Sequence, residues 1–157
     1  AQQLDATDRE YLEGLPAITR QESVLFAHGS PRDPVWEYVD SSAVATPLFL
    51  AFDFRQCYVG HTHQAVVATP DQAYGHTNFF NIRDGDEFDL TTLRLLINPG
   101  STGQPRDGDP RAAYGIVDTS RNVFIAHRVA YDVEFVQREM LAAGLPAPLA
   151  DRLAIGH

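Results

Sequence analysis

The sequence predicts a mixed α/β domain whose second half is rich in β-strands. Two short apolar runs, 24–27 and 57–59, each lead into glycine and histidine, as buried strands do when they deliver side chains to one edge of an open sheet. Helical and strand-like segments alternate in the first half. In the second half, strand-like runs follow one another between Gly, Pro, Asn and Asp residues. We therefore expect an α/β fold of the α+β kind.

The first half is expected to alternate between helix and strand. Asp5 or Thr7 can cap an opening helix that Gly14 and Pro16 end, and a later run that is apolar on most sides predicts a buried helix. The expected elements are a helix at 5–14, a strand pair or one bent strand over 18–21 and 23–27, a loop at 29–40, a helix at 42–54 and a strand at 56–59, followed by a turn at 60–63.

The second half is expected to contain five strand-like runs and two closing helices. Arg121-Asn122 lies between two of the runs and predicts a hairpin turn. Asp132 can cap a helix in which Val133, Val136 and Met140 recur at helical spacing. The runs lie at 65–69, 74–82, 88–97, 113–118 and 123–131, and a shorter helix is expected at 148–155.

Composition limits the classes of function. A chain of 157 residues is one domain or part of one, and its net charge of −9 leaves no basic stripe for nonspecific binding to nucleic acid or to acidic membranes. Cys57 is the only cysteine, so no disulfide can form within the chain. No apolar stretch approaches about 18 residues and no signal peptide is recognisable. We expect a cytoplasmic protein without a membrane partner.

Three histidines form the strongest functional pattern. His28 follows one expected strand, and His61 and His63 follow another behind Gly60, where the missing Cβ would allow a tight turn. In extended backbone, side chains two residues apart point to the same side, so the pair could reach two metal ions about 3.5–4 Å apart. Three neutral imidazoles could also hold one zinc ion. Dinuclear lactamase-type hydrolases continue His-x-His with x-Asp-His, whereas Gln64 follows His63 here, so that class is excluded.

These segments resemble motifs of the calcineurin-like metallophosphoesterases. Ala27-His28-Gly29 and Gly60-His61-Thr62-His63 are similar to the last two motifs of that family, and Asn98-Pro99-Gly100-Ser101 is similar to a loop of its small bacterial and archaeal phosphodiesterase branch. The resemblance implies a four-layer αββα sandwich with mixed sheets. It also implies hydrolysis of a phosphodiester or phosphomonoester by water activated between two divalent metal ions (Mn, Fe, Zn or Ni). His28 and His61 would share one ion, and His63 would bind the other.

Three earlier motifs of the family have no counterpart here: Asp-x-His, Gly-Asp-x-x-Asp and Gly-Asn-His. The segment 85–89 matches the second formally but follows the histidines, and we interpret it as a turn. The resemblance therefore implies that residues 1–157 are the C-terminal portion of a single metallophosphoesterase domain, inactive alone. A second chain supplying the missing strands is one possible partner.

Two arginines and one asparagine complete the candidate site. Arg32 follows His28 and Arg106 follows the Asn98 loop, and either could contact a substrate phosphate. Asn98 is expected to shape its own turn. Two alternatives to catalysis remain open at this stage. One is a non-catalytic scaffold or binding module that retains the fold, and the other is a structural zinc site, for which no fourth His or Cys is suitably placed.

Overall fold

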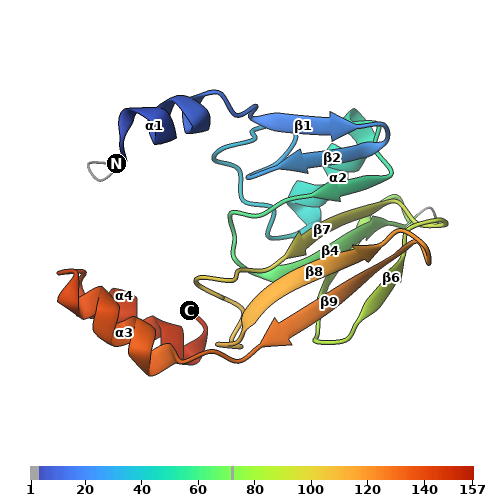
Figure 1. Ribbon diagram of the computed structural model, residues 1–157. Helices are drawn as coiled ribbons and strands as arrows, with labels where there is room; N and C mark the ends of the chain where they lie inside the picture. Colours follow the sequence, from blue (N-terminus) through green and yellow to red (C-terminus); the bar gives the residue numbers. More distant parts are fainter. Residues whose placement is uncertain (1–3, 72) are drawn as a thin grey trace.

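Two β-sheets packed face to face form the frame of the molecule (Figure 1). The computed structural model describes residues 4–71 and 73–157. The larger sheet has six strands, in the order β1 (Ile18–Gln21), β2 (Val24–Ala27), β3 (Gln56–Tyr58), β7 (Leu95–Pro99), β4 (Ala65–Pro70) and β5 (Thr77–Asn81). The smaller sheet has three, in the order β6 (Glu87–Asp89), β9 (Val123–Val129) and β8 (Ala112–Asp118).

Parallel pairing in the middle of the larger sheet places the candidate site. β2 runs parallel to β3, with Leu25 opposite Cys57, and β3 runs parallel to β7, with Cys57 opposite Leu96. On one side, β1 pairs antiparallel with β2. On the other side, β4 pairs antiparallel with β7, and β5 pairs antiparallel with β4. Because parallel strands end at the same edge of a sheet, the residues after Ala27 and after Tyr58 leave that edge side by side.

Two apolar cores separate three layers of structure. Helix α2 (Ser42–Ala51) packs on one face of the larger sheet, where Leu48, Cys57 and Leu96 are buried. On the opposite face, Ile97 and Phe124 belong to the core between the two sheets. Burial raises the pKa of the Cys57 thiol to about 12, so the side chain behaves as a small buried apolar group.

Helix α2 ends at Ala51 rather than at the predicted Phe54, and Arg94 accounts for the difference. Its guanidinium donates hydrogen bonds to the carbonyls of Phe49, Phe52 and Phe54, at 3.1, 2.9 and 2.9 Å. It also lies over the rings of Phe49 and Phe54. A cation that satisfies the last carbonyls stabilises this early end of the helix.

The predicted run 88–97 is wrong as a single strand. It is divided between β6 and β7, which belong to different sheets. Asp89 makes the break, since its carboxylate accepts hydrogen bonds from the Thr91 N–H and from the hydroxyls of Thr91 and Thr92. These bonds, those of Thr91 foremost, lower the pKa of Asp89 to about 2. The local hydrogen bonds favour a turn over a continuous ladder.

The helices at the two ends follow the capping pattern in the sequence. Asp5 caps α1 (Ala6–Glu13), and Asp132 caps α3 (Val133–Ala142) by accepting from the N–H of Phe135 at 2.9 Å. α3 packs beside α4 (Ala147–Asp151) and the 3₁₀ turn η1 (Arg152–Ile155) at the end of the smaller sheet (Figure 1). The hairpin turn is confirmed, with Asn122 at a φ of 53°.

The predicted fold class is confirmed: helix, mixed sheet and second sheet stack in succession. Gly85 lies in the turn between β5 and β6, with a φ of 85°, whereas residues 87–89 form β6 itself, so the interpretation of 85–89 as a turn holds only for its first residues. Among the helices of the described residues, none combines the length and the apolar character that crossing a bilayer would need.

The contact between Gly115 and Phe124 gives a direct test of the packing between β8 and β9. A Cβ at Gly115 would lie 2.1 Å from the Phe124 ring, whereas one at Gly103 would meet nothing within 4 Å. We expect Gly115→Ala to lower the free energy of unfolding by about 1–3 kcal/mol, because the ring must move. Gly103→Ala is the matched control. Equal urea midpoints for the two variants would contradict this packing.

Candidate metal centre

His28 leaves the end of β2 into a tightly folded loop. The Gly29 N–H donates to the carbonyl of Pro34 at 2.7 Å. A Cβ at Gly29 would lie 2.6 Å from the carbonyl oxygen of Asp33, so the close return of the loop requires glycine here. The sequence placed His28 in this position correctly, and the fold explains why glycine follows it.

The imidazoles of His28 and His61 meet across the strand ends. Nε2 of His28 lies 2.9 Å from Nδ1 of His61. The two backbones are joined as well, because the Gly60 N–H donates to the carbonyl of His28 at 2.9 Å. Tyr38, from the loop after β2, stacks on the His61 ring with a centroid distance of 4.0 Å and an interplanar angle of 21°. The two ring nitrogens therefore share one small space, where they can hold a common proton or a common cation.

The backbone of this turn differs from the extended chain that the His-x-His spacing suggested. His61 and His63 have φ angles of 62° and 59°, in the left-handed region. Each such non-glycine residue costs about 1–3 kcal/mol, and residues of this kind cluster at functional sites. Gly60, by contrast, does not have a positive φ, and a Cβ there would make only ordinary contacts, 3.5 Å or more away. The expected reason for a glycine at position 60 was therefore wrong.

Asn98 holds the strained turn in place. Its side chain is fully buried, and its amide donates to the carbonyl of Gly60 at 2.7 Å and to the hydroxyl of Thr62 at 2.8 Å. Its side-chain oxygen accepts from the N–H of Gly100 at 3.0 Å. The last bond confirms the expectation that Asn98 shapes its own turn. The first two extend its role to the histidine segment, 36 to 38 residues earlier in the chain.

His63 is turned toward the Asn98 loop. Its Nδ1 lies 2.8 Å from the carbonyl oxygen of Gln104, and its own carbonyl accepts from the N–H of Arg106 at 3.0 Å. A carbonyl oxygen can only accept, so Nδ1 must carry the proton. In the neutral ring this leaves the lone pair on Nε2 free, which is the arrangement that metal-binding histidines commonly have.

The charges at the site favour a neutral His28. Burial lowers the pKa of His28, and the positive charges that His61 and His63 can carry lower it further. A neutral imidazole is the form that binds metals. In residues 4–71 and 73–157, no group of three His, Cys, Asp or Glu side chains is arranged to hold a metal ion. The structure thus brings His28 and His61 together and keeps His63 nearby, without joining the three in one cage.

The two candidate arginines differ in their partners. Arg32 forms an ion pair with Glu37, which also accepts from the Ser30 hydroxyl, and the guanidinium lowers the pKa of Glu37. Arg106 donates to the side-chain oxygen of Gln104 at 2.8 Å, and its buried Nε–H has no hydrogen-bond partner in the described part of the chain. Arg32 is therefore largely neutralised, whereas the guanidinium of Arg106 is bound to a neutral amide.

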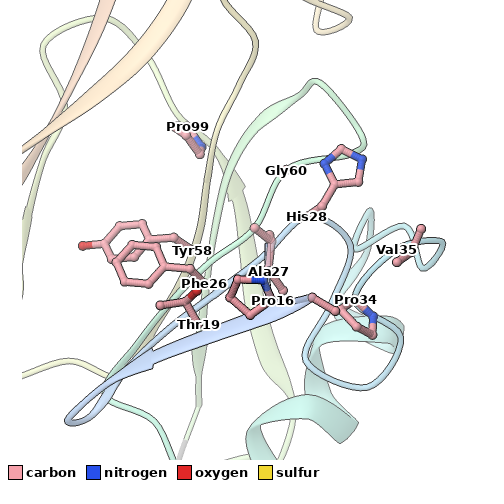
Figure 2. A pocket seen from close by; sticks show the side chains of 12 residues that line it. Pro16, Thr19, Phe26, Ala27, His28, Pro34, Val35, Tyr58, Gly60 and Pro99 are labelled. Atoms are coloured by element: carbon pink, nitrogen blue, oxygen red, sulfur yellow. The ribbon is translucent and has the colours of Figure 1, made fainter. Parts of the chain in front are cut away.

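An open, mainly apolar groove adjoins His28. It has a volume of about 500 Å³ and is lined by residues that include Pro16, Phe26, Val35 and Tyr58. Figure 2 shows His28 at one end of this groove and the rings of Phe26 and Tyr58 at the other; these two rings stack at 5.3 Å. The groove gives His28 an accessible side.

A buried ion pair holds the chain just after residues 60–63, which we call the histidine turn. Asp107 accepts from the N–H of Ala65 at 2.9 Å and pairs with Arg128 of β9, whose side chain is 6% exposed. Sequence reasoning missed this pair and the Tyr38 stack, because each joins distant segments through contacts without a local pattern. Gln104 acts through its backbone carbonyl, which no residue pattern could identify.

The Asp107–Arg128 pair gives a test of this support. We expect Asp107→Ala to lower the free energy of unfolding by about 3–5 kcal/mol, because it leaves the Arg128 charge buried without its partner. Glu87→Ala breaks an exposed pair with Arg121 and is expected to change stability far less. Chemical denaturation of both variants measures the difference. Equal losses of unfolding free energy in the two variants would show that burial of the Asp107–Arg128 pair adds nothing to its effect on stability.

Comparisons with known proteins agree with this geometry. No protein-family model matches the sequence. An uncharacterized protein of Methanocaldococcus jannaschii is 30% identical over 154 residues, which cover 94% of this chain and 59% of that protein. A crystal structure of a metallophosphoesterase from Sphaerobacter thermophilus superposes with a TM-score of 0.93 at 42% identity, covering 99% of this chain and 64% of that one.

A more distant structure extends the comparison. A hypothetical protein from Pyrococcus horikoshii matches with a TM-score of 0.69 at 18% identity, over 96% of this chain and 55% of that one, and supports the fold alone. The chain thus spans between half and two thirds of the length of the proteins it matches. Over that span, the two packed sheets give this chain the fold of that metallophosphoesterase.

Proposed function

We propose that the intact protein hydrolyses a phosphate ester, with His28 and His61 holding one divalent metal ion and His63 a second. The observation that carries this proposal is the 2.9 Å between Nε2 of His28 and Nδ1 of His61. Two nitrogens bound at right angles to one ion, with metal–nitrogen bonds of about 2.0–2.1 Å, would lie about 3 Å apart. The two rings therefore need little movement to share an ion.

The chemistry of the donor set fits this role. When bound, two divalent ions lower the pKa of a water molecule and offset the negative charge of the phosphoryl oxygens. The chain's own residues orient two of the three imidazoles: Tyr38 stacks on His61, and the Gln104 carbonyl leaves Nε2 of His63 free. Imidazole suits zinc, iron and nickel, while manganese prefers additional oxygen ligands.

The described residues supply only part of the ligands that each ion needs. We propose that carboxylate ligands come from polypeptide outside these 157 residues, either in the same chain or in a second one. Under this proposal, the 157-residue piece alone is inactive and the intact protein is active. We propose that Arg106 helps to hold the substrate, because its backbone N–H donates to the His63 carbonyl and its guanidinium donates to the neutral side chain of Gln104 rather than to a carboxylate.

Metal removal tests the proposed chemistry. We expect the intact protein to hydrolyse bis-p-nitrophenyl phosphate, to lose this activity after treatment with a chelator, and to regain it with Mn²⁺, Fe²⁺, Zn²⁺ or Ni²⁺. Metal analysis should find two ions per active protein. An intact protein that binds metal but turns over neither phosphodiesters nor phosphomonoesters would favour the scaffold alternative and contradict the proposal.

The two arginines give a paired test of substrate binding. We expect Arg106→Ala to lower kcat/KM by about 10- to 100-fold, since a hydrogen bond to a charged group contributes about 1.5–3 kcal/mol. Arg32→Ala should cause a smaller loss, because Glu37 already neutralises Arg32. Steady-state kinetics on both variants, with melting temperatures as a folding control, measures this difference. A larger loss in Arg32→Ala would reverse the assignment.

A further inference from the structure

We infer that Ser101 is a positioning residue for His63: it fixes the Gln104 carbonyl that holds the His63 ring with its proton on Nδ1. This inference rests on the proposed function, because it explains how one of the proposed metal ligands presents Nε2. It assigns a role to the Asn98-Pro99-Gly100-Ser101 loop that differs from contact with substrate.

The position of Ser101 is itself fixed by the sheets. Its carbonyl accepts from the N–H of Ala113 in β8 at 2.9 Å. Gly100, just before it, has a φ of 94° and approaches so closely that a Cβ there would lie 2.7 Å from the Cβ of Ala113. The chain therefore enters residue 101 in a single orientation, on the rigid frame of β7 and β8.

The Ser101 side chain, held in this orientation, fixes the backbone of Gln104 through a hydrogen bond. Its hydroxyl oxygen accepts from the N–H of Gln104 at 2.9 Å, which closes a short turn. Pro105 follows and is fully buried, and a residue before proline is restricted to extended backbone. With its N–H bound on one side and proline on the other, Gln104 has its carbonyl aimed in one direction, toward His63.

The carbonyl then decides the tautomer of His63. Free histidine side chains favour the tautomer with the proton on Nε2, which would place the lone pair of Nδ1 against the Gln104 oxygen. The 2.8 Å separation between these atoms requires the opposite tautomer. Mutation of a group that hydrogen-bonds a metal ligand, without binding the metal itself, typically changes metal affinity by about 10- to 100-fold.

Asn98, the first residue of the loop, is poorly suited to bind substrate directly. All polar atoms of the Asn98 amide are engaged with Gly60, Thr62 and Gly100, and the side chain is fully buried. The Ser101 hydroxyl oxygen is engaged with Gln104. The side chains of this loop contact the histidine turn, either directly or through Gln104. A role in positioning the histidines accounts for these contacts.

Nuclear magnetic resonance of the metal-free intact protein tests this inference without reference to activity. Long-range ¹H–¹⁵N spectra at pH 8, with histidine labelled, distinguish the two tautomers. We expect His63 to be the Nδ1–H tautomer, Ser101→Ala to introduce a population of the Nε2–H tautomer, and Ser101→Thr, which keeps the hydroxyl, to restore the original state. Ser120→Ala removes a hydroxyl from an exposed turn between β8 and β9 and should have no effect.

Zinc titration gives the second readout. We expect Ser101→Ala to weaken Zn²⁺ binding by about 10- to 100-fold, with Ser101→Thr close to the original protein. The inference is overturned if His63 carries its proton on Nε2 in the original protein. It is also overturned if Ser101→Ala leaves the tautomer unchanged, or changes the tautomer without changing the affinity. A protein that shows the expected tautomer and affinity changes yet hydrolyses no phosphate ester would support the inference and contradict the proposed function.

Discussion

Parallel pairing of β2, β3 and β7 is the constraint on which the site depends. The register that places Leu25, Cys57 and Leu96 in one row makes the three strands end at one edge. His28 leaves from the first of these strands and His61 from the second, so their rings meet at 2.9 Å although 33 residues separate them in the chain. The apolar cores on both faces of the sheet keep this edge rigid.

The strained turn is stable because contacts from other segments offset its cost. His61 and His63 adopt left-handed backbone, which costs about 1–3 kcal/mol for each. Asn98 holds the start of the turn, and the Gln104 carbonyl and the Asp107–Arg128 pair hold its end.

Patterns along the chain predicted the features that depend on local chemistry. The strands before His28 and His61, the Asp132 cap and the turn at Asn122 were all correct, because apolar runs, caps and turn residues act within a few positions. The long run 88–97 was wrong because the Asp89 turn outweighed its apolar pattern. Backbone carbonyls and contacts between distant loops, which orient His63, leave no such pattern, so the fold was needed to find them.

The account depends on three imidazoles that bind two neighbouring cations. Anomalous X-ray diffraction from crystals of the intact protein, grown with zinc, measures this directly. The proposed function predicts one peak bound by Nε2 of His28 and Nδ1 of His61, and a second bound by Nε2 of His63, about 3.5–4 Å away. Crystals in which zinc is present but neither peak lies within bonding distance of these nitrogens would contradict it.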